Sequence, residues 1–163
     1  MKFHLSLFIL LSIVACAPAT EEAVEEPDTT EADVEAINKV LGDYESALNA
    51  GNLDSVMPLY ADDAVFMPVN APVQVGEQAI RAFYQTNIFE QLTLDLTFTP
   101  AETEILGEWA FVRADITGTV TDKDSIEPDQ VDNKAMFLLR QDDDGSWKIA
   151  RYIFNDNNPP SEQ

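Results

Sequence analysis

The chain has almost none of the residues that supply the commonest nucleophiles and metal ligands. Its 163 residues include a single cysteine, Cys16, and a single histidine, His4. Cys16 directly follows the apolar residues 8–15, which come after a lone Lys2. A short cationic start, about ten apolar residues and a small residue before the cut are typical of a secretory signal, whereas a membrane span needs about 20 apolar residues. We therefore expect residues 1–15 to be a signal peptide.

The position of Cys16 predicts a lipid anchor. Ile13-Val14-Ala15-Cys16 resembles the lipobox of bacterial lipoproteins, in which the signal is removed and the new terminal cysteine is acylated. The alternative is an ordinary secretory signal with an incidental cysteine. In the sorting rule of lipoproteins an aspartate after the cysteine holds the protein at the inner membrane, and this chain has Ala17 there. We expect a lipid-anchored protein of the bacterial cell envelope, facing the periplasm, with the outer membrane favoured over the inner.

Loss of the signal would restrict the chemistry of the mature chain. Without His4, and with Cys16 acylated, it would have no imidazole and no free thiol. That excludes Cys–His and Ser–His catalysis, zinc held by cysteine or histidine, and disulfides. We expect no metal and no cofactor. With 30 acidic against 9 basic residues, the net charge is −21, which disfavours nucleic acid and anionic headgroups as partners. The membrane is therefore expected to contact the lipid anchor only.

The rest of the chain divides into a tether and one domain. Residues 17–32 contain six acids and no basic or aromatic residue, so we expect residues 16–32 to be a disordered acidic tether behind the lipidated cysteine. Residues 33–160 are long enough for one domain, and the 45% hydrophobic composition can fill one core. Residues 161–163 are a short tail.

Apolar spacing predicts helices in the first half of the domain. From Val34 to Leu48 apolar residues recur every three or four positions, which indicates an amphipathic helix closed by Gly51. A short second helix is expected from residue 52 to Tyr60, followed by a turn at Asp62-Asp63 and a strand over residues 64–67. Residues 77–91 predict a third helix.

The second half changes to strand-like patterns. Four segments rich in β-branched and aromatic residues, 93–106, 109–120, 134–141 and 147–154, are expected to be strands. Residues 142–145, Asp-Asp-Asp-Gly, predict the hairpin turn between the last two. Helices followed by an antiparallel meander indicate an α+β domain, with about three N-terminal helices packed on a curved antiparallel sheet.

Several segments carry a family resemblance. Tyr44–Asp54, Leu59–Val65 and Gly76–Tyr84 look like the first half of the NTF2-like superfamily, the cystatin-like cone of ketosteroid isomerase and SnoaL-like proteins. Asp144–Arg151 resembles the ending of the DUF4440 branch. The resemblance covers residues 33–160 and implies the cone fold. It does not name a function, because this fold hosts isomerases, dehydratases, cyclases and binding modules.

The isomerase's functional residues are only partly present. By resemblance its oxyanion-hole tyrosine falls on Tyr44 and the two supporting tyrosines on Tyr60 and Tyr84. Its general base falls near Met67-Pro68 and its second, protonated acid near Phe137, so both carboxylates are missing. Ketosteroid isomerase chemistry needs an ionised base and an acid at the enolate oxygen. We therefore do not expect that activity.

The same register predicts the residues that face into the cone. Arg113 and Asp115 share one face of a strand, since they are two residues apart. The pair is either a polar anchor for a ligand or a catalytic set, with Asp115 as base and Tyr44 or Arg113 as stabiliser. The alternative is an ordinary ion pair on a solvated face. The predicted pocket comprises Tyr44, Tyr60, Phe66, Tyr84, Phe111, Arg113, Asp115, Phe137, Tyr152 and Phe154.

Three functions remain open at this stage. The first is an envelope protein that binds a small, largely apolar or amphipathic molecule in its cone. The second is a cofactor-free isomerase or lyase, such as a dehydratase. The third is an interaction module that pairs as a homodimer through the convex face of the sheet, as the resemblance implies.

Overall fold

A computed structural model of the protein describes residues 31–158. The predicted signal peptide with His4, the lipidation site Cys16, residues 16–30 of the predicted tether and the tail 161–163 lie outside the described residues. The described part is a single α+β unit in which helices cover one side of a six-stranded sheet.

The helices follow the predicted order. Helix α1 spans Glu31–Asn49, so it begins at Glu31 rather than at Asp33. Gly51, at φ 62°, follows its end in the left-handed conformation that glycine favours. Helix α2 (Leu53–Val56) continues into the 3-10 turn η1 (Met57–Leu59), and α3 (Glu77–Phe83) continues into the π-helical segment η2 (Tyr84–Phe89). None of the helices between residues 31 and 158 is long and apolar enough to cross a membrane.

The sheet contains the four predicted long strands, the predicted strand over residues 64–67, which begins earlier at Tyr60, and one short strand that was not predicted. Strands β3 (Leu92–Leu106), β4 (Trp109–Asp122), β5 (Asp129–Gln141) and β6 (Trp147–Asp156) form the expected antiparallel meander. Strand β1 (Tyr60–Met67) is paired with the short β2 (Gln74–Val75) and runs parallel to β6, giving the order β2-β1-β6-β5-β4-β3. The predicted turn at Asp62-Asp63 was wrong. Both residues lie within β1, where an irregularity between Tyr60 and Val65 shifts the pairing with β6.

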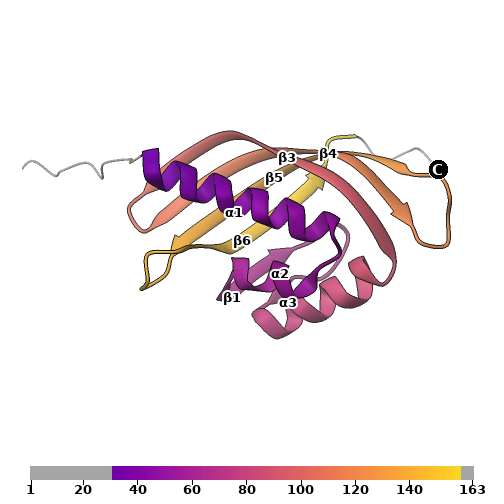
Figure 1. The fold of residues 1–163 in the computed structure, drawn as a ribbon, viewed down its shortest axis with the longest axis horizontal. Coiled ribbons are helices and arrows are strands. Elements are labelled where there is room, and N and C mark those ends of the chain that lie inside the picture. The colour runs from indigo at the N-terminus through magenta and orange to yellow at the C-terminus, as the bar shows by residue number, and fades with distance from the viewer. Residues whose placement is uncertain (1–30, 159–163) are drawn as a thin grey trace, which may run out of the picture.

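Helix α1 lies along the face of the curved sheet (Figure 1). Helices α2 and α3 lie together beside β1, toward the C-terminal end of α1. Two α1 side chains bind the backbone of the edge strand β3. The Asn49 amide donates to the Leu96 carbonyl at 2.8 Å and accepts from the Leu96 N–H at 2.9 Å, and Glu45 accepts from the Phe98 N–H at 2.7 Å. Because an edge strand leaves backbone groups unpaired, these bonds both cover the edge and fix the helix over the sheet.

Beside this contact, β3 and β4 approach each other too closely for any side chain. Gly118 is at φ 135°, and a Cβ there would lie 2.1 Å from the Asp95 carbonyl oxygen. Glycine is therefore required at this position, where β4 passes Leu96, its pairing partner on β3. The contact sets the spacing of the two strands that form one wall of the interior.

Candidate ligand cavity

An apolar cavity of about 270 Å³ lies between the helices and the concave face of the sheet. Tyr44 and Leu48 of α1 line one side, and Phe83, Tyr84 and Ile88 of α3 and η2 line the next. The strands and the segment after β1 supply the remaining lining residues, namely Phe66, Pro68, Val69, Leu92, Leu94, Leu96, Phe98, Ile116, Val120, Val131, Asn133, Tyr152 and Phe154. Its size is close to the lower limit of typical ligand pockets, which suits a small molecule.

The cavity contains few polar groups and no ionic ones. Within residues 31–158, no acidic or basic side chain lines it. The polar side chains are the phenols of Tyr44, Tyr84 and Tyr152 and the amide of Asn133. A ligand in this space would therefore be held mainly by apolar contact, with its orientation set by neutral hydrogen-bonding groups.

Three tyrosine hydroxyls from three separate elements meet at the buried end. The hydroxyl of Tyr84 in η2 bonds to that of Tyr60 in β1 at 2.9 Å and, through a shorter bond, to that of Tyr44 in α1. The Tyr44 and Tyr60 hydroxyls are 3.3 Å apart. Three mutual bonds can use all three hydroxyl protons within the ring, leaving one acceptor lone pair on each oxygen. We call these residues the tyrosine triad.

Burial keeps the phenols in their neutral form. It raises the pKa of Tyr44 and of Tyr60 well above 10.0, and neighbouring phenols raise both pKa values further. Burial also raises the pKa of Tyr84 to about 12, although hydrogen bonds from the other two triad residues oppose the shift. The pKa of Tyr152 is raised by burial and then by Tyr84. At neutral pH the cavity therefore carries no phenolate charge.

Stacked aromatic rings make one wall of the cavity. Phe66 of β1 stacks on Tyr84 and on Tyr152, with ring centroids 5.4 and 5.2 Å apart. Tyr152 also stacks on Phe137 of β5, with ring centroids 4.3 Å apart and 4° between the ring planes. Such contacts are worth about 0.5–1.5 kcal/mol each beyond the burial itself, so this wall is expected to be rigid.

Most of the predicted pocket residues lie at or directly behind the cavity. Tyr44, Phe66, Tyr84, Tyr152 and Phe154 line it. Tyr60 lies behind the lining as the third member of the tyrosine triad, and Phe137 is fully buried against Tyr44 and Tyr152. The structure thus brings seven of the predicted residues together, while their role in binding a ligand stays a prediction.

The predicted inward face of β4 was wrong. Phe111, Arg113 and Asp115 lie on the outer face, whereas Ala110, Val112, Ala114 and Ile116 are buried on the inner face. The error is one residue of register: Phe137 pairs with Val112, so Val112 shares its inward direction. Arg113 instead bonds to Glu102 of β3 at 3.3 Å in an exposed ion pair, and Asp115 is exposed opposite Lys134.

This correction removes the proposed catalytic set. Asp115 and Arg113 are on the opposite side of the sheet from Tyr44, so Asp115 cannot act as a base toward a molecule in the cavity. The ion-pair alternative holds for Arg113, but its partner is Glu102 rather than Asp115. A proton-transfer enzyme needs a base within hydrogen-bond reach of the substrate. No carboxylate among the described residues that line the cavity meets this condition.

Sequence reasoning missed the lining residues on β3, β4 and the start of β5. Leu92, Leu94, Leu96 and Phe98 alternate with polar residues, a period-two signal that was available in the sequence. Asn133 has the same inward parity as Phe137 but precedes residue 134, where the sequence predicts the strand to begin. Strand β5 in fact begins at Asp129, which adds Val131 and Asn133 to the inner face.

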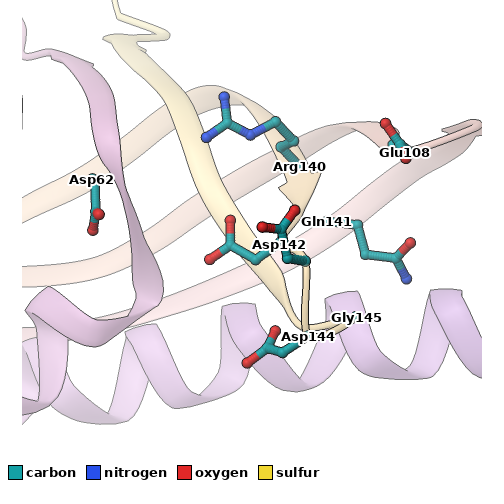
Figure 2. Close-up of a pocket in the computed structure, with 8 residues that line it drawn as sticks. Asp62, Glu108, Arg140, Gln141, Asp142, Asp144 and Gly145 are labelled. Carbon is teal, nitrogen blue, oxygen red and sulfur yellow. The ribbon is translucent and has the colours of Figure 1, made fainter.

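A larger, open hollow of about 890 Å³ lies around the β5–β6 turn (Figure 2). Unlike the apolar cavity, it is lined mainly by charged and polar side chains. Its labelled carboxylates are spread around the turn and do not converge on one point. Arg140 is bound in a two-bond ion pair to Asp63, at 2.8 and 3.1 Å, and lowers the pKa of that carboxyl. Within residues 31–158 no group of three or more histidine, cysteine, aspartate or glutamate residues could hold a metal ion. We therefore take the apolar cavity as the candidate site.

Comparisons with known proteins agree with this architecture. Residues 41–152 match the family model of the SnoaL-like domain. A ketosteroid isomerase-like protein from Erwinia carotovora atroseptica is 29% identical, with a TM-score of 0.73 over 80% of this chain and 100% of its own. The predicted superfamily and cystatin-like cone are thus confirmed, whereas the finer placement in the DUF4440 branch stays a prediction.

Two more distant structures share the fold alone. An NTF-2 like protein of unknown function from Shewanella oneidensis is 23% identical, with a TM-score of 0.63 over 76% of this chain and 99% of its own. A domain of unknown function with a cystatin-like fold from Nostoc punctiforme is 20% identical, with a TM-score of 0.66 over 81% of this chain and 82% of its own.

Proposed function

We propose that this chain, which belongs to the SnoaL-like domain family, binds a small and largely apolar molecule in the cavity between its helices and its sheet. The observation that carries this proposal is the composition of the cavity. It is lined by apolar and aromatic side chains, with neutral phenols at its buried end. Binding there would bury apolar surface of the ligand at roughly 25 cal/mol per Å².

The composition of the cavity favours binding over catalysis. A cofactor-free isomerase or lyase would need a group that takes up a proton at the substrate. The tyrosine triad could donate a hydrogen bond to a developing oxyanion, but no carboxylate among residues 31–158 lines the cavity to act as its base. The enzyme alternative is therefore the weaker proposal for this chain.

Binding of a neutral fluorescent probe tests the proposal. We expect N-phenyl-1-naphthylamine to bind the purified protein with a rise in fluorescence. Val131 lines the cavity, so Val131→Trp should fill the space and abolish binding. Gln130 lies next to it on the opposite, exposed face of β5, so Gln130→Trp is the matched control and should bind as the wild type does. Equal binding by both variants would contradict the proposal.

We also propose that acylated Cys16 anchors the protein in the cell envelope. The support is the lipobox-like Ile13-Val14-Ala15-Cys16 at the end of an apolar run. Cys16→Ser should abolish acylation and move the protein from the membrane to the soluble fraction. Membrane attachment of the serine variant in a detergent-partition assay would overturn this proposal.

Homodimer formation through the outer face of the sheet is a further proposal. At the middle of this face Met136 of β5 and its pairing partner Ile153 of β6 are 46% and 36% exposed. Arg113, the partner of Met136 on β4, is beside Glu102, so the face carries both charge signs around an apolar centre. We expect sedimentation to show a dimer, and Met136→Lys to shift it toward the monomer. A wild-type monomer at high concentration would contradict the proposal.

A further inference from the structure

We infer that the cavity is selective for uncharged ligands, that the amide of Asn133 recognises their polar group at the mouth, and that anionic amphiphiles are rejected. This inference rests on the proposed ligand-binding function and specifies the chemical class of the ligand. Three features of the described residues carry it: the placement of Asn133, the charges around the mouth, and the closed hydrogen bonding of the buried end.

Asn133 is placed to meet a ligand at the open end of the cavity. The lining residues Val120, Val131 and Asn133 are half-buried, whereas Tyr44 and Tyr84 are buried, so the cavity opens beside Asn133. Asn133 lines the cavity on the inner face of β5, opposite Ile116 of β4, which also lines the cavity. Its side chain is partly buried, and no hydrogen bond is made to it within residues 31–158. Asn49 of α1, by contrast, already donates one hydrogen bond and accepts one at the backbone of Leu96. Asn133 therefore offers a free donor and a free acceptor to a bound molecule.

The charges around the mouth are acidic. Asp156 of β6 is the pairing partner of Asn133, so the two side chains lie on the same face. The cavity residue Val120 lies near the end of β4, and Val131 lies near the start of β5. Asp122 ends β4, Asp129 begins β5, and the connection between them contains Asp124 and Glu127. An anionic group held beside Asn133 would therefore face repulsion from carboxylates in addition to the cost of leaving water.

The nearby cations do not offset this field inside the cavity. Lys134 has the outward parity on β5, and its ammonium donates to the Asp156 carbonyl at 3.2 Å. Lys123 donates to the Phe89 carbonyl at the end of η2. Neither lines the cavity. An anion that entered would have no ion-pair partner among the lining residues.

The buried end offers no site for a charge either. The three hydroxyls of the tyrosine triad are bonded to one another, so donation to a ligand requires one of these bonds to open. The side chains around them that line the cavity, such as Leu48 and Phe98, are apolar. The Tyr152 phenol, which also lines the cavity, is kept neutral by burial, which raises its pKa. The end away from Asn133 therefore suits a ring or short hydrocarbon chain, and the ligand is oriented with its polar group outward.

A matched pair of probes tests the selectivity in the wild-type protein. N-phenyl-1-naphthylamine and 8-anilino-1-naphthalenesulfonate share one ring skeleton and differ by a sulfonate. We expect the sulfonate to displace the neutral probe at least about tenfold more weakly, because its charge must be buried without a partner. Binding of neither probe would overturn the proposed function. Equal affinity for both would overturn the selectivity while leaving the proposed function in place.

Charge placement at the mouth gives a gain-of-binding test. Asn133→Lys puts a cation at the mouth beside Asp156, so displacement by the sulfonate should improve several-fold. Thr117→Lys makes the same charge change on the exposed outer face of β4 and should leave the displacement weak. An equal improvement in both variants would show a general charge effect and overturn the assignment to the mouth.

A second variant tests the amide itself and does not depend on a new charge. The wild type should bind 2-naphthol about three- to tenfold more tightly than naphthalene, in line with one net hydrogen bond. Asn133→Leu removes the amide and should abolish this preference while keeping the affinity for naphthalene. A preference that survives in the leucine variant would overturn the role of Asn133.

Discussion

The inner and outer faces of strands β3 to β6 differ in exposure, polarity and charge. Their inner face is apolar and buried, with Val112, Ala114 and Phe137 at 0%, 0% and 0% exposure, and it forms one side of the cavity. Their outer face carries the exposed Arg113, Asp115 and Met136. Because alternate residues of a strand point to opposite faces, a shift of one position exchanges a candidate base for a wall residue. In this fold, the face that each strand turns inward therefore decides which side chains can contact a ligand in the cavity.

The largest expected difference between the faces is in stability. Phe137→Ala removes a fully buried ring that stacks on Tyr152 and contacts Tyr44, and should lower the free energy of unfolding by about 3–5 kcal/mol. Phe111→Ala makes the same change on the half-buried outer face and should cost about 1 kcal/mol. Urea unfolding of both variants checks this. Similar losses, measured at a concentration at which sedimentation shows a monomer, would contradict the difference in burial between the two faces.

High pH should destabilise the inner face selectively. All four tyrosines of the chain, Tyr44, Tyr60, Tyr84 and Tyr152, have a pKa raised by burial, that of Tyr84 to about 12. The unfolded chain, with tyrosine pKa values near 10, releases its protons first, so stability is present below pH 10 and falls as the pH rises toward 12. Tyr84 alone accounts for a loss of roughly 2–3 kcal/mol.

A spectrophotometric titration measures this directly. Tyrosinate absorbance should stay low as the pH passes 10 and then appear cooperatively with the loss of circular dichroism. The folded protein should show no separate early step, because no tyrosine remains on the outer face. A tyrosine that titrates near pH 10 while the protein is still folded would show that at least one of the four phenols is exposed.

Removing hydrogen bonds from the tyrosine triad should lower the free energy of unfolding by a smaller amount, with Tyr84→Phe costing more than Tyr60→Phe. Tyr84→Phe removes the two shorter bonds and leaves only the 3.3 Å contact between Tyr44 and Tyr60, so it should cost about 1–2 kcal/mol. Tyr60→Phe leaves the short bond between Tyr44 and Tyr84 in place and should cost less. Unfolding free energies at neutral pH check the order of the two variants. A reversed order would contradict the described geometry.

The smallest effect on stability and on probe binding is expected at Asp115, the residue that the sequence suggested as a catalytic base. Asp115→Asn on the outer face should change neither the stability, within about 0.5 kcal/mol, nor the affinity for N-phenyl-1-naphthylamine. The isosteric control is Asn133→Asp, which adds a carboxylate to the cavity lining and should weaken probe binding. Titrations with the same probe compare the two. Loss of binding in Asp115→Asn would place that carboxylate at the site after all.

The sequence contained enough information for the fold but only part of the site. Period-three and period-four apolar residues located α1, and the Asp-Asp-Asp-Gly turn located the β5–β6 hairpin, because both signals are local. The convergence of Tyr44, Tyr60 and Tyr84 came from the family resemblance, since three residues from different elements meet only through the tertiary fold. These parts of the prediction were right for different reasons.

The inward face of β4 was wrongly predicted because the register implied by the family resemblance is one residue out of phase with the apolar alternation of the strand itself. Ala110, Val112, Ala114 and Ile116 form an unbroken apolar series, and the charged Arg113 and Asp115 alternate with them. Burying the charged series would have required desolvation that the apolar series avoids. The parallel pairing of β1 with β6 left no such local signal, since it depends on the path of the chain from Met67 to the last strand.

A crystal structure of the protein grown with N-phenyl-1-naphthylamine would show directly whether the cavity holds a ligand. We expect density for the probe between Tyr84 and Asn133, with its amine near the Asn133 amide and the outer face of β4 unchanged. An interior filled by the protein's own side chains, or a probe bound only on the outer face, would contradict this expectation.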